Sequence, residues 1–187
     1  MYAFFLSVGI VALAEIGDKT QLLSFVLAAR YRKPIPIIAG ILIATLLNHG
    51  VASALGAWIA QALADTSLRW ILGLSFIAMA GWMLIPDSLD EAALRPPRWG
   101  VFMTTLVVFF LAEMGDKTQI ATVALAARFD AFWTVLLGTT AGMMIANVPA
   151  VLIGERLANR LPVQAIHRVA AVVFLILGVA VLVVKQS

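Results

Sequence analysis

Long apolar stretches separated by short polar joins dominate the pattern along the chain. A helix that crosses a membrane needs about 20 mostly apolar residues, and six stretches meet or approach that length. They cover residues 2–29, 35–63, 70–86, 100–127, 132–158 and 169–184. The joins contain most of the charged residues, and none of them is long enough for a soluble domain. The pattern therefore predicts an all-α integral membrane protein, with six transmembrane helices in a single domain spanning residues 1–187.

Composition supports a bilayer as the solvent of this protein. Apolar residues make up 63% of the chain and charged residues 12%, against about 45–50% and 25% in soluble domains. The absence of cysteine excludes disulfides, thiolate metal centres and cysteine nucleophiles. The net charge of +3 comes without a long basic run, so no nucleic-acid partner is expected.

An internal repeat organises the sequence. Residues 13–30 and 111–128 are identical at 12 of 18 positions without a gap, and the pairs Gly40/Gly138 and Gly56/Gly154 keep the same offset of 98 residues. We therefore expect two three-helix units, residues 1–86 and 100–187, joined by a loop at 87–99. Because three is odd, the second unit enters the membrane from the opposite side. This inverted repeat is typical of secondary transporters.

Lysine and arginine in the short joins predict the orientation. Eight of them lie in the joins after spans one, three and five, and three lie on the other side. Because basic loops stay in the cytoplasm, the loop 87–99 is expected to be cytoplasmic and both termini outside. His167 falls in the last of these basic joins and is expected to be solvated.

Charged side chains also lie deep within two of the predicted spans. They are Glu15, Asp18 and Lys19 in the first repeat, and Glu113, Asp116 and Lys117 in the second. At 1.5 Å per helical residue, both clusters reach the central zone of the bilayer. A charge there costs at least about 2.5–3.5 kcal/mol, so it should face the protein interior or a water-filled path. Within each cluster, Glu and Asp are three residues apart and Glu and Lys are four apart, which places all three side chains on one helical face.

The charge balance of these clusters favours a divalent cation as ligand. Four carboxylates and two ammonium groups leave a formal charge of −2, and Thr20, Gln21, Thr118 and Gln119 add hydroxyl and amide oxygens. Such oxygens suit Ca²⁺, Mg²⁺ and Mn²⁺. The lysines would pair with acids or replace the ion. In the alternative, each lysine only neutralises the glutamate four residues before it, which does not account for the excess of acids.

Other features within the spans leave two readings open. Gly17 and Gly115 permit either a close helix approach or a broken helix that offers carbonyl groups to an ion. Asn48, His49 and Asn147 lie in the second and fifth spans, where interhelical hydrogen bonds are the more common role. His49 could instead serve as a softer ligand or a proton carrier.

The motif Glu-x-Gly-Asp-Lys-Thr, at residues 15–20 and again at 113–118, resembles the signature of the GDT-type cation exchanger family. The resemblance implies export of Mn²⁺, and in some members Ca²⁺, in exchange for protons, with no cofactor besides the transported ion. It assigns the site to Glu15, Asp18, Lys19 and Thr20 and to Glu113, Asp116, Lys117 and Thr118. The long acidic central loop and targeting extension of eukaryotic members are missing, which favours a multi-pass protein of a bacterial plasma membrane.

Other functions fit the sequence less well. A small-metabolite exporter with an anionic substrate should have an excess of basic groups, whereas acids are in excess here. An intramembrane enzyme or an assembly factor lacks support, because no histidine-rich metal motif or nucleophile constellation is present. Mn²⁺ is expected over Mg²⁺, which loses its water reluctantly, and a Ca²⁺/H⁺ antiporter is the alternative. The expected partners are a divalent metal ion, protons and lipid, and the oligomeric state stays open.

Overall fold

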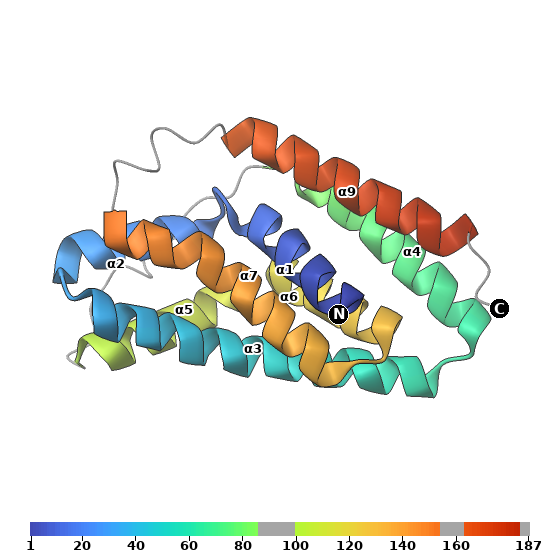
Figure 1. The fold of residues 1–187 in the computed structure, drawn as a ribbon, viewed down its shortest axis with the longest axis horizontal. Helices are drawn as coiled ribbons and strands as arrows, with labels where there is room; N and C mark the ends of the chain where they lie inside the picture. Colours follow the sequence, from blue (N-terminus) through green and yellow to red (C-terminus); the bar gives the residue numbers. More distant parts are fainter. Residues whose placement is uncertain (86–99, 154–162, 184–187) are drawn as a thin grey trace.

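The structure is a computed structural model that describes residues 1–85, 100–153 and 163–183. Within these ranges the chain forms eight α-helices and no strand (Figure 1). They are α1 (Tyr2–Glu15), α2 (Lys19–Tyr31), α3 (Pro34–Ala62), α4 (Asp65–Trp82), α5 (Val101–Glu113), α6 (Lys117–Phe129), α7 (Phe132–Ile153) and α9 (Val163–Val183). Helices α3, α7 and α9 are long and apolar enough to cross a membrane, and α1 and α5 are shorter apolar helices.

Both predicted spans that carry the motif are broken at its glycine. Helix α1 ends at Glu15 and α2 begins at Lys19, and α5 and α6 are separated in the same way. Gly17 has φ +84° and Gly115 has φ +72°, a backbone region that glycine adopts without steric cost. The prediction that the three charged residues of each motif share one helical face was therefore wrong, because the glutamate ends one helix and the lysine begins the next. Of the two roles left open for these glycines, a broken helix is observed at both, and a close helix approach is observed at Gly17 as well, where α9 covers the break.

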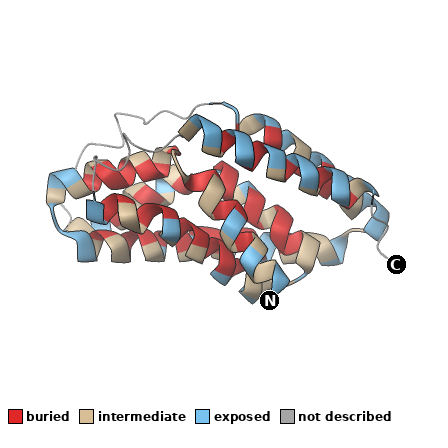
Figure 2. Cartoon of the chain, turned by 45° about the horizontal axis from the view of Figure 1, so that its top comes forward, coloured by how far each residue is buried: buried red, intermediate tan, exposed pale blue. Residues whose placement is uncertain are grey.

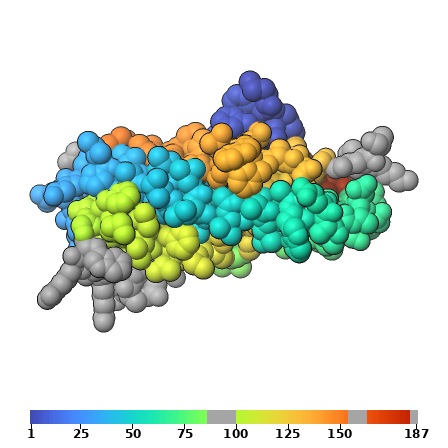
Figure 3. All heavy atoms as spheres, turned by 90° about the horizontal axis from the view of Figure 1, so that it is seen from below, coloured from blue at the N-terminus to red at the C-terminus, as the bar shows by residue number. Residues whose placement is uncertain are grey.

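Helices from the two halves of the chain pack against each other in a reciprocal way. Helix α3 lies along α5 and α6, and α7 lies along α1 (Figure 1). At one contact, a Cβ on Gly40 would be 2.8 Å from Cβ of Thr105, and at the other a Cβ on Gly138 would be 2.9 Å from Cβ of Ser7. Gly40 and Gly138 are 98 residues apart in the sequence, and so are Ser7 and Thr105. The two contacts therefore involve corresponding positions of the two halves. Seen from below, α3 runs along the molecule with α5 beside its N-terminal part (Figure 3).

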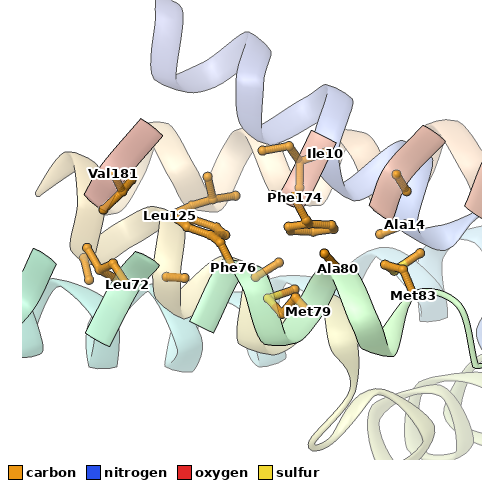
Figure 4. Close-up of a cluster of buried hydrophobic side chains, with 14 of the residues drawn as sticks. Ile10, Ala14, Leu72, Phe76, Met79, Ala80, Met83, Leu125, Phe174 and Val181 are labelled. Atoms are coloured by element: carbon orange, nitrogen blue, oxygen red, sulfur yellow. The ribbon is translucent and has the colours of Figure 1, made fainter. Parts of the chain in front are cut away.

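Helices α4 and α9 form a pair that packs on one side of this group. Their central rings, Phe76 and Phe174, are stacked with centroids 6.2 Å apart. Figure 4 shows these rings in an apolar cluster that also includes Ile10 of α1 and Leu125 of α6. Exposed residues follow the outer faces of the pair, whereas the inner helices, α1 to α3 and α5 to α7, are buried over much of their length (Figure 2).

The boundaries of several predicted spans change in the structure. The prediction of 35–63 agrees with α3 to within one residue. Helix α4 begins at Asp65 and α9 at Val163, so two predicted joins, 64–69 and 159–168, are partly helical. An acidic residue in the first turn of α4 stabilises that helix end. The loop predicted at 87–99 and the predicted end of span five, 154–158, lie outside the described residues.

Candidate metal site between the two helix breaks

The two helix breaks meet through ion pairs that cross between the motifs. Lys19 Nζ lies 2.8 Å from Asp116 Oδ1, and Lys117 Nζ lies 3.4 Å from Asp18 Oδ1. Each lysine therefore reaches the aspartate of the other motif. Pairing of each lysine with the glutamate of its own motif, the simple neutralisation considered above, is wrong: the break rotates the lysine away from the helix that ends at that glutamate.

Three carboxylates from both motifs converge beside these pairs. Glu15, Glu113 and Asp116 are buried, and each can place one oxygen within 4.8 Å of the others. Opposite ligands of a cation with bonds of about 2.0–2.6 Å lie about 4–5 Å apart, so the three groups fit around a single ion. Oε2 of Glu15 and Oε2 of Glu113 have no hydrogen-bond partner among the described residues. A bound cation would satisfy these buried oxygens.

Hydroxyl groups that follow each break orient the two glutamates. Thr20 Oγ1 donates a hydrogen bond to Oε1 of Glu15, and Thr118 Oγ1 donates one to Oε1 of Glu113. Each threonine thus occupies one oxygen of its glutamate and leaves the other available.

The glutamines of the motif stabilise the glycine turns. Oε1 of Gln21 accepts a hydrogen bond from the Gly17 N–H at 2.8 Å, and Oε1 of Gln119 accepts one from the Gly115 N–H at 2.7 Å. These bonds give partners to the backbone N–H groups of the two breaks, where the regular hydrogen bonding of a helix is interrupted. A further role of the threonine and glutamine oxygens as metal ligands stays a prediction.

Polar side chains from α3 and α7 reach the same site. Asn147 Nδ2 donates to Oε1 of Glu15 at 3.2 Å, and His49 Nε2 lies 3.7 Å from Oε1 of Glu113. Asn48 Nδ2 donates to the Phe110 carbonyl group at 3.1 Å, which joins α3 to α5. The structure thus places all three auxiliary residues within or beside the site.

The prediction that His167 is solvated in a loop was wrong. The residue lies on α9, is only 9% exposed, and has Nε2 2.9 Å from the carbonyl oxygen of Ile16 at the first break. One turn earlier, Val163 covers Gly17, where a Cβ would be 2.1 Å from Val163 Cγ1. The available sequence signal was helical spacing, because His167 precedes the apolar residues Ala170, Ala171 and Phe174 by three, four and seven positions.

The second break has different surroundings from the first. Apart from Gly115 itself and its two chain neighbours, no described residue has an atom within 4 Å of the position that a Cβ on Gly115 would occupy, and Met114 is 56% exposed. For the lysines, the first motif has the more exposed residue: Lys19 is 26% exposed and Lys117 only 1%. Two nearly identical motifs therefore have unequal environments.

Comparison with known proteins gives matches over almost the whole chain. The family described as "Divalent cation/proton antiporter GDT1" matches residues 3–91 and 101–187. A Vibrio cholerae protein named "Putative manganese exporter" is 53% identical over 176 residues, which cover 94% of this chain and 88% of that protein. A GDT1-like protein of Synechocystis is 26% identical over 196 residues, or 95% of each chain. No solved structure matches the chain.

Proposed function

Because the chain belongs to the GDT1 family of divalent cation/proton antiporters, we propose that it exports Mn²⁺ in exchange for protons through the site between its two motifs. The observation that carries this proposal is the convergence of Glu15, Glu113 and Asp116 within 4.8 Å. The name of the Vibrio cholerae relative supports manganese as the ion.

The charges of the site support an exchange of one ion for protons. Four carboxylates and two lysines carry a formal charge of −2, which a divalent cation neutralises. Protons neutralise the same carboxylates, so protonation and metal binding compete. Release of the metal on one side of the membrane then favours protonation there, and loss of the protons on the other side restores metal binding. Glu15 and Glu113 are the proposed exchanging groups, because each has a buried oxygen without a hydrogen bond in the described ranges.

The wider ligand set is part of the same proposal. It comprises Glu15, Asp18, Thr20, Gln21, Glu113, Asp116, Thr118 and Gln119, with Lys19 and Lys117 as compensating charges. Asp18 is included because it pairs with Lys117. It is not one of the three carboxylates in the cluster. The lysines would keep the aspartates neutralised while the glutamates exchange protons for the ion.

We propose an inverted repeat of two three-helix units as the architecture. In this arrangement α1 with α2, and α5 with α6, each form one broken span, and α3, α4, α7 and α9 form the other four. The reciprocal glycine contacts and the crossed lysine pairs support it, as does the use of broken helices at repeat interfaces in secondary transporters. The membrane would be a bacterial plasma membrane, with both termini outside and residues 87–99 in the cytoplasm, and the protein would not act as an enzyme.

Transport into reconstituted vesicles tests the proposed function. Wild-type protein should move Mn²⁺ when a pH step is applied, and Glu15→Gln and Glu113→Gln should each abolish this flux while the protein still inserts. Asp65→Asn is the matched control, because it removes one carboxylate charge at the exposed start of α4.

Two outcomes would change the assignment. If either glutamine variant kept its flux and its pH dependence, that glutamate would be structural and the proton would pass through Asp18, Asp116 or His49. If wild-type vesicles moved Ca²⁺ and not Mn²⁺, the chain would be a Ca²⁺/H⁺ antiporter.

A further inference from the structure

His49 and Asn147 occupy corresponding positions in the two halves of the chain but carry different chemistry. They are 98 residues apart, which is the offset between the two motifs. Asn147 contacts Glu15, and His49 lies beside Glu113. The two glutamates of the site therefore have different neighbours at this position, although the motifs themselves are nearly identical.

The hydrogen bonds of these two residues also differ. Asn147 Nδ2 donates to Glu15 and to the Met143 carbonyl group, and its Oδ1 accepts a hydrogen bond from Ser24. His49 is fully buried, and neither of its ring nitrogens makes a hydrogen bond within the described ranges. Leaving a buried polar group without a hydrogen-bond partner is unfavourable. Asn147 is thus a supporting residue, whereas His49 has a nitrogen lone pair available at the site.

We propose that His49 is a metal ligand, and that its imidazole nitrogen makes the site select a first-row transition-metal cation such as Mn²⁺ over Ca²⁺ and Mg²⁺. This inference rests on the proposed function and specifies the class of ion. Nε2 lies 3.7 Å from Oε1 of Glu113. This is shorter than the separation of about 4–5 Å between opposite ligands of one ion, so both side chains can reach the same ion as neighbouring ligands. His49 and the three carboxylates then form a mixed nitrogen and oxygen site.

The mixed site explains how selectivity arises. Ca²⁺ and Mg²⁺ take oxygen ligands, so carboxylates alone do not exclude them. Transition metals accept imidazole as well, and replacement of one oxygen by nitrogen therefore favours them. One imidazole, from the first half of the chain, is sufficient because both motifs contribute to a single site. By the usual order of divalent affinities, Co²⁺ should bind more tightly than Mn²⁺.

Pulsed electron paramagnetic resonance of Mn²⁺ bound to the full chain tests this proposal directly. The chain has two histidines, so His167→Gln is the matched control, and a purification tag without histidine is required. Histidine nitrogen coupling to Mn²⁺ should be present in the wild type and in His167→Gln, and absent in His49→Asn. Labelling of histidine with ¹⁵N in the wild-type protein identifies the coupled nitrogen without any substitution.

Binding constants provide the second measurement. His49→Asn, which copies the residue of the other half, should lower Mn²⁺ affinity at least about tenfold, a loss seen even for groups that only support a ligand. Its Ca²⁺ affinity should hardly change.

Mn²⁺ bound to the wild type without histidine coupling would overturn the proposal and leave the proposed function intact. Equal losses of Mn²⁺ and Ca²⁺ affinity in His49→Asn would overturn it as well, because the residue would then be structural. Absence of Mn²⁺ binding in the wild type would overturn both.

Discussion

Substitution of the two motif glycines by alanine should destabilise the protein to different extents. Both residues have positive φ, so either alanine places a side chain in left-handed backbone, at a cost of about 1–2 kcal/mol. Among the described residues, only Gly17 of the two is also covered by another helix. A Cβ there would be 2.1 Å from Val163 Cγ1, whereas a Cβ on Gly115 would meet nothing within 4 Å besides its chain neighbours. Gly115→Ala is therefore a matched control for the contact between α9 and the first break.

The expected difference follows from the steric overlap. Overpacking a filled site costs about 1–3 kcal/mol, so Gly17→Ala should lose about 2–5 kcal/mol in total and Gly115→Ala about 1–2 kcal/mol. A change of 1 kcal/mol moves the melting temperature of a chain of this size by about 2–4 °C. Gly17→Ala should then melt about 2–12 °C below Gly115→Ala.

Thermal unfolding in detergent micelles, followed by tryptophan fluorescence, measures this difference. Val163→Ala removes the methyl group that the new Cβ would meet, so it should recover part of the loss in Gly17→Ala and none of the loss in Gly115→Ala. A double-mutant cycle should give a coupling of about 1–3 kcal/mol for Gly17 with Val163 and close to zero for Gly115 with Val163. Equal melting temperatures of the two alanine variants, without rescue by Val163→Ala, would refute the packing of α9 on the first break.

Three further measurements test the ion pairs, the competition with protons and the topology. Lys117→Met should lower stability by about 3–5 kcal/mol, because it leaves the carboxylate of the 1% exposed Asp18 as a buried charge, and additional Asp18→Asn should restore part of the loss. Mn²⁺ affinity, measured from the signal of the free ion, should fall as pH is lowered, because protons occupy the carboxylates that bind the metal; affinity independent of pH would argue against exchange. Cysteines at Asp90 and Ser187 should react with an impermeant thiol reagent on intact cells only at 187, and the reverse result would invert the proposed topology.

The sequence predicted the helical class and the position of the long helix α3, because a sustained apolar stretch defines a helix without reference to its neighbours. The family was also predictable, since Glu15–Thr20 and its second copy contain little besides the residues of the site, and the match over both halves confirms it. The residues that meet in the three-carboxylate cluster were all among the candidates drawn from the sequence.

The arrangement within the site was less predictable, because it depends on contacts between distant parts of the chain. The spacing of Glu15, Asp18 and Lys19 places them on one face only if the helix continues, and a glycine at the centre allows either outcome. The crossed pairing of Lys19 with Asp116 depends on how the two halves meet. The same holds for His167, whose contact with Ile16 requires α9 to begin six residues before its predicted start.

The differences between the halves bear on how an exchanger with two similar motifs can work. If the transport path had exact twofold symmetry, the site would at any moment be open to both sides of the membrane or closed to both. Exchange therefore requires that the two halves differ in conformation. The inner helices are arranged reciprocally, whereas α9 packs against α1 at the first break and α4 packs against α6. Within the described ranges, the α4–α9 pair therefore departs from the reciprocal packing of the inner helices. This difference is visible at the two helix breaks: Val163 of α9 covers Gly17 at the first break, whereas Met114 is exposed at the second. The proposed exchange site thus lies among the helices that pack reciprocally, and the packing of α4 and α9 is a difference between the two halves of the kind that exchange requires.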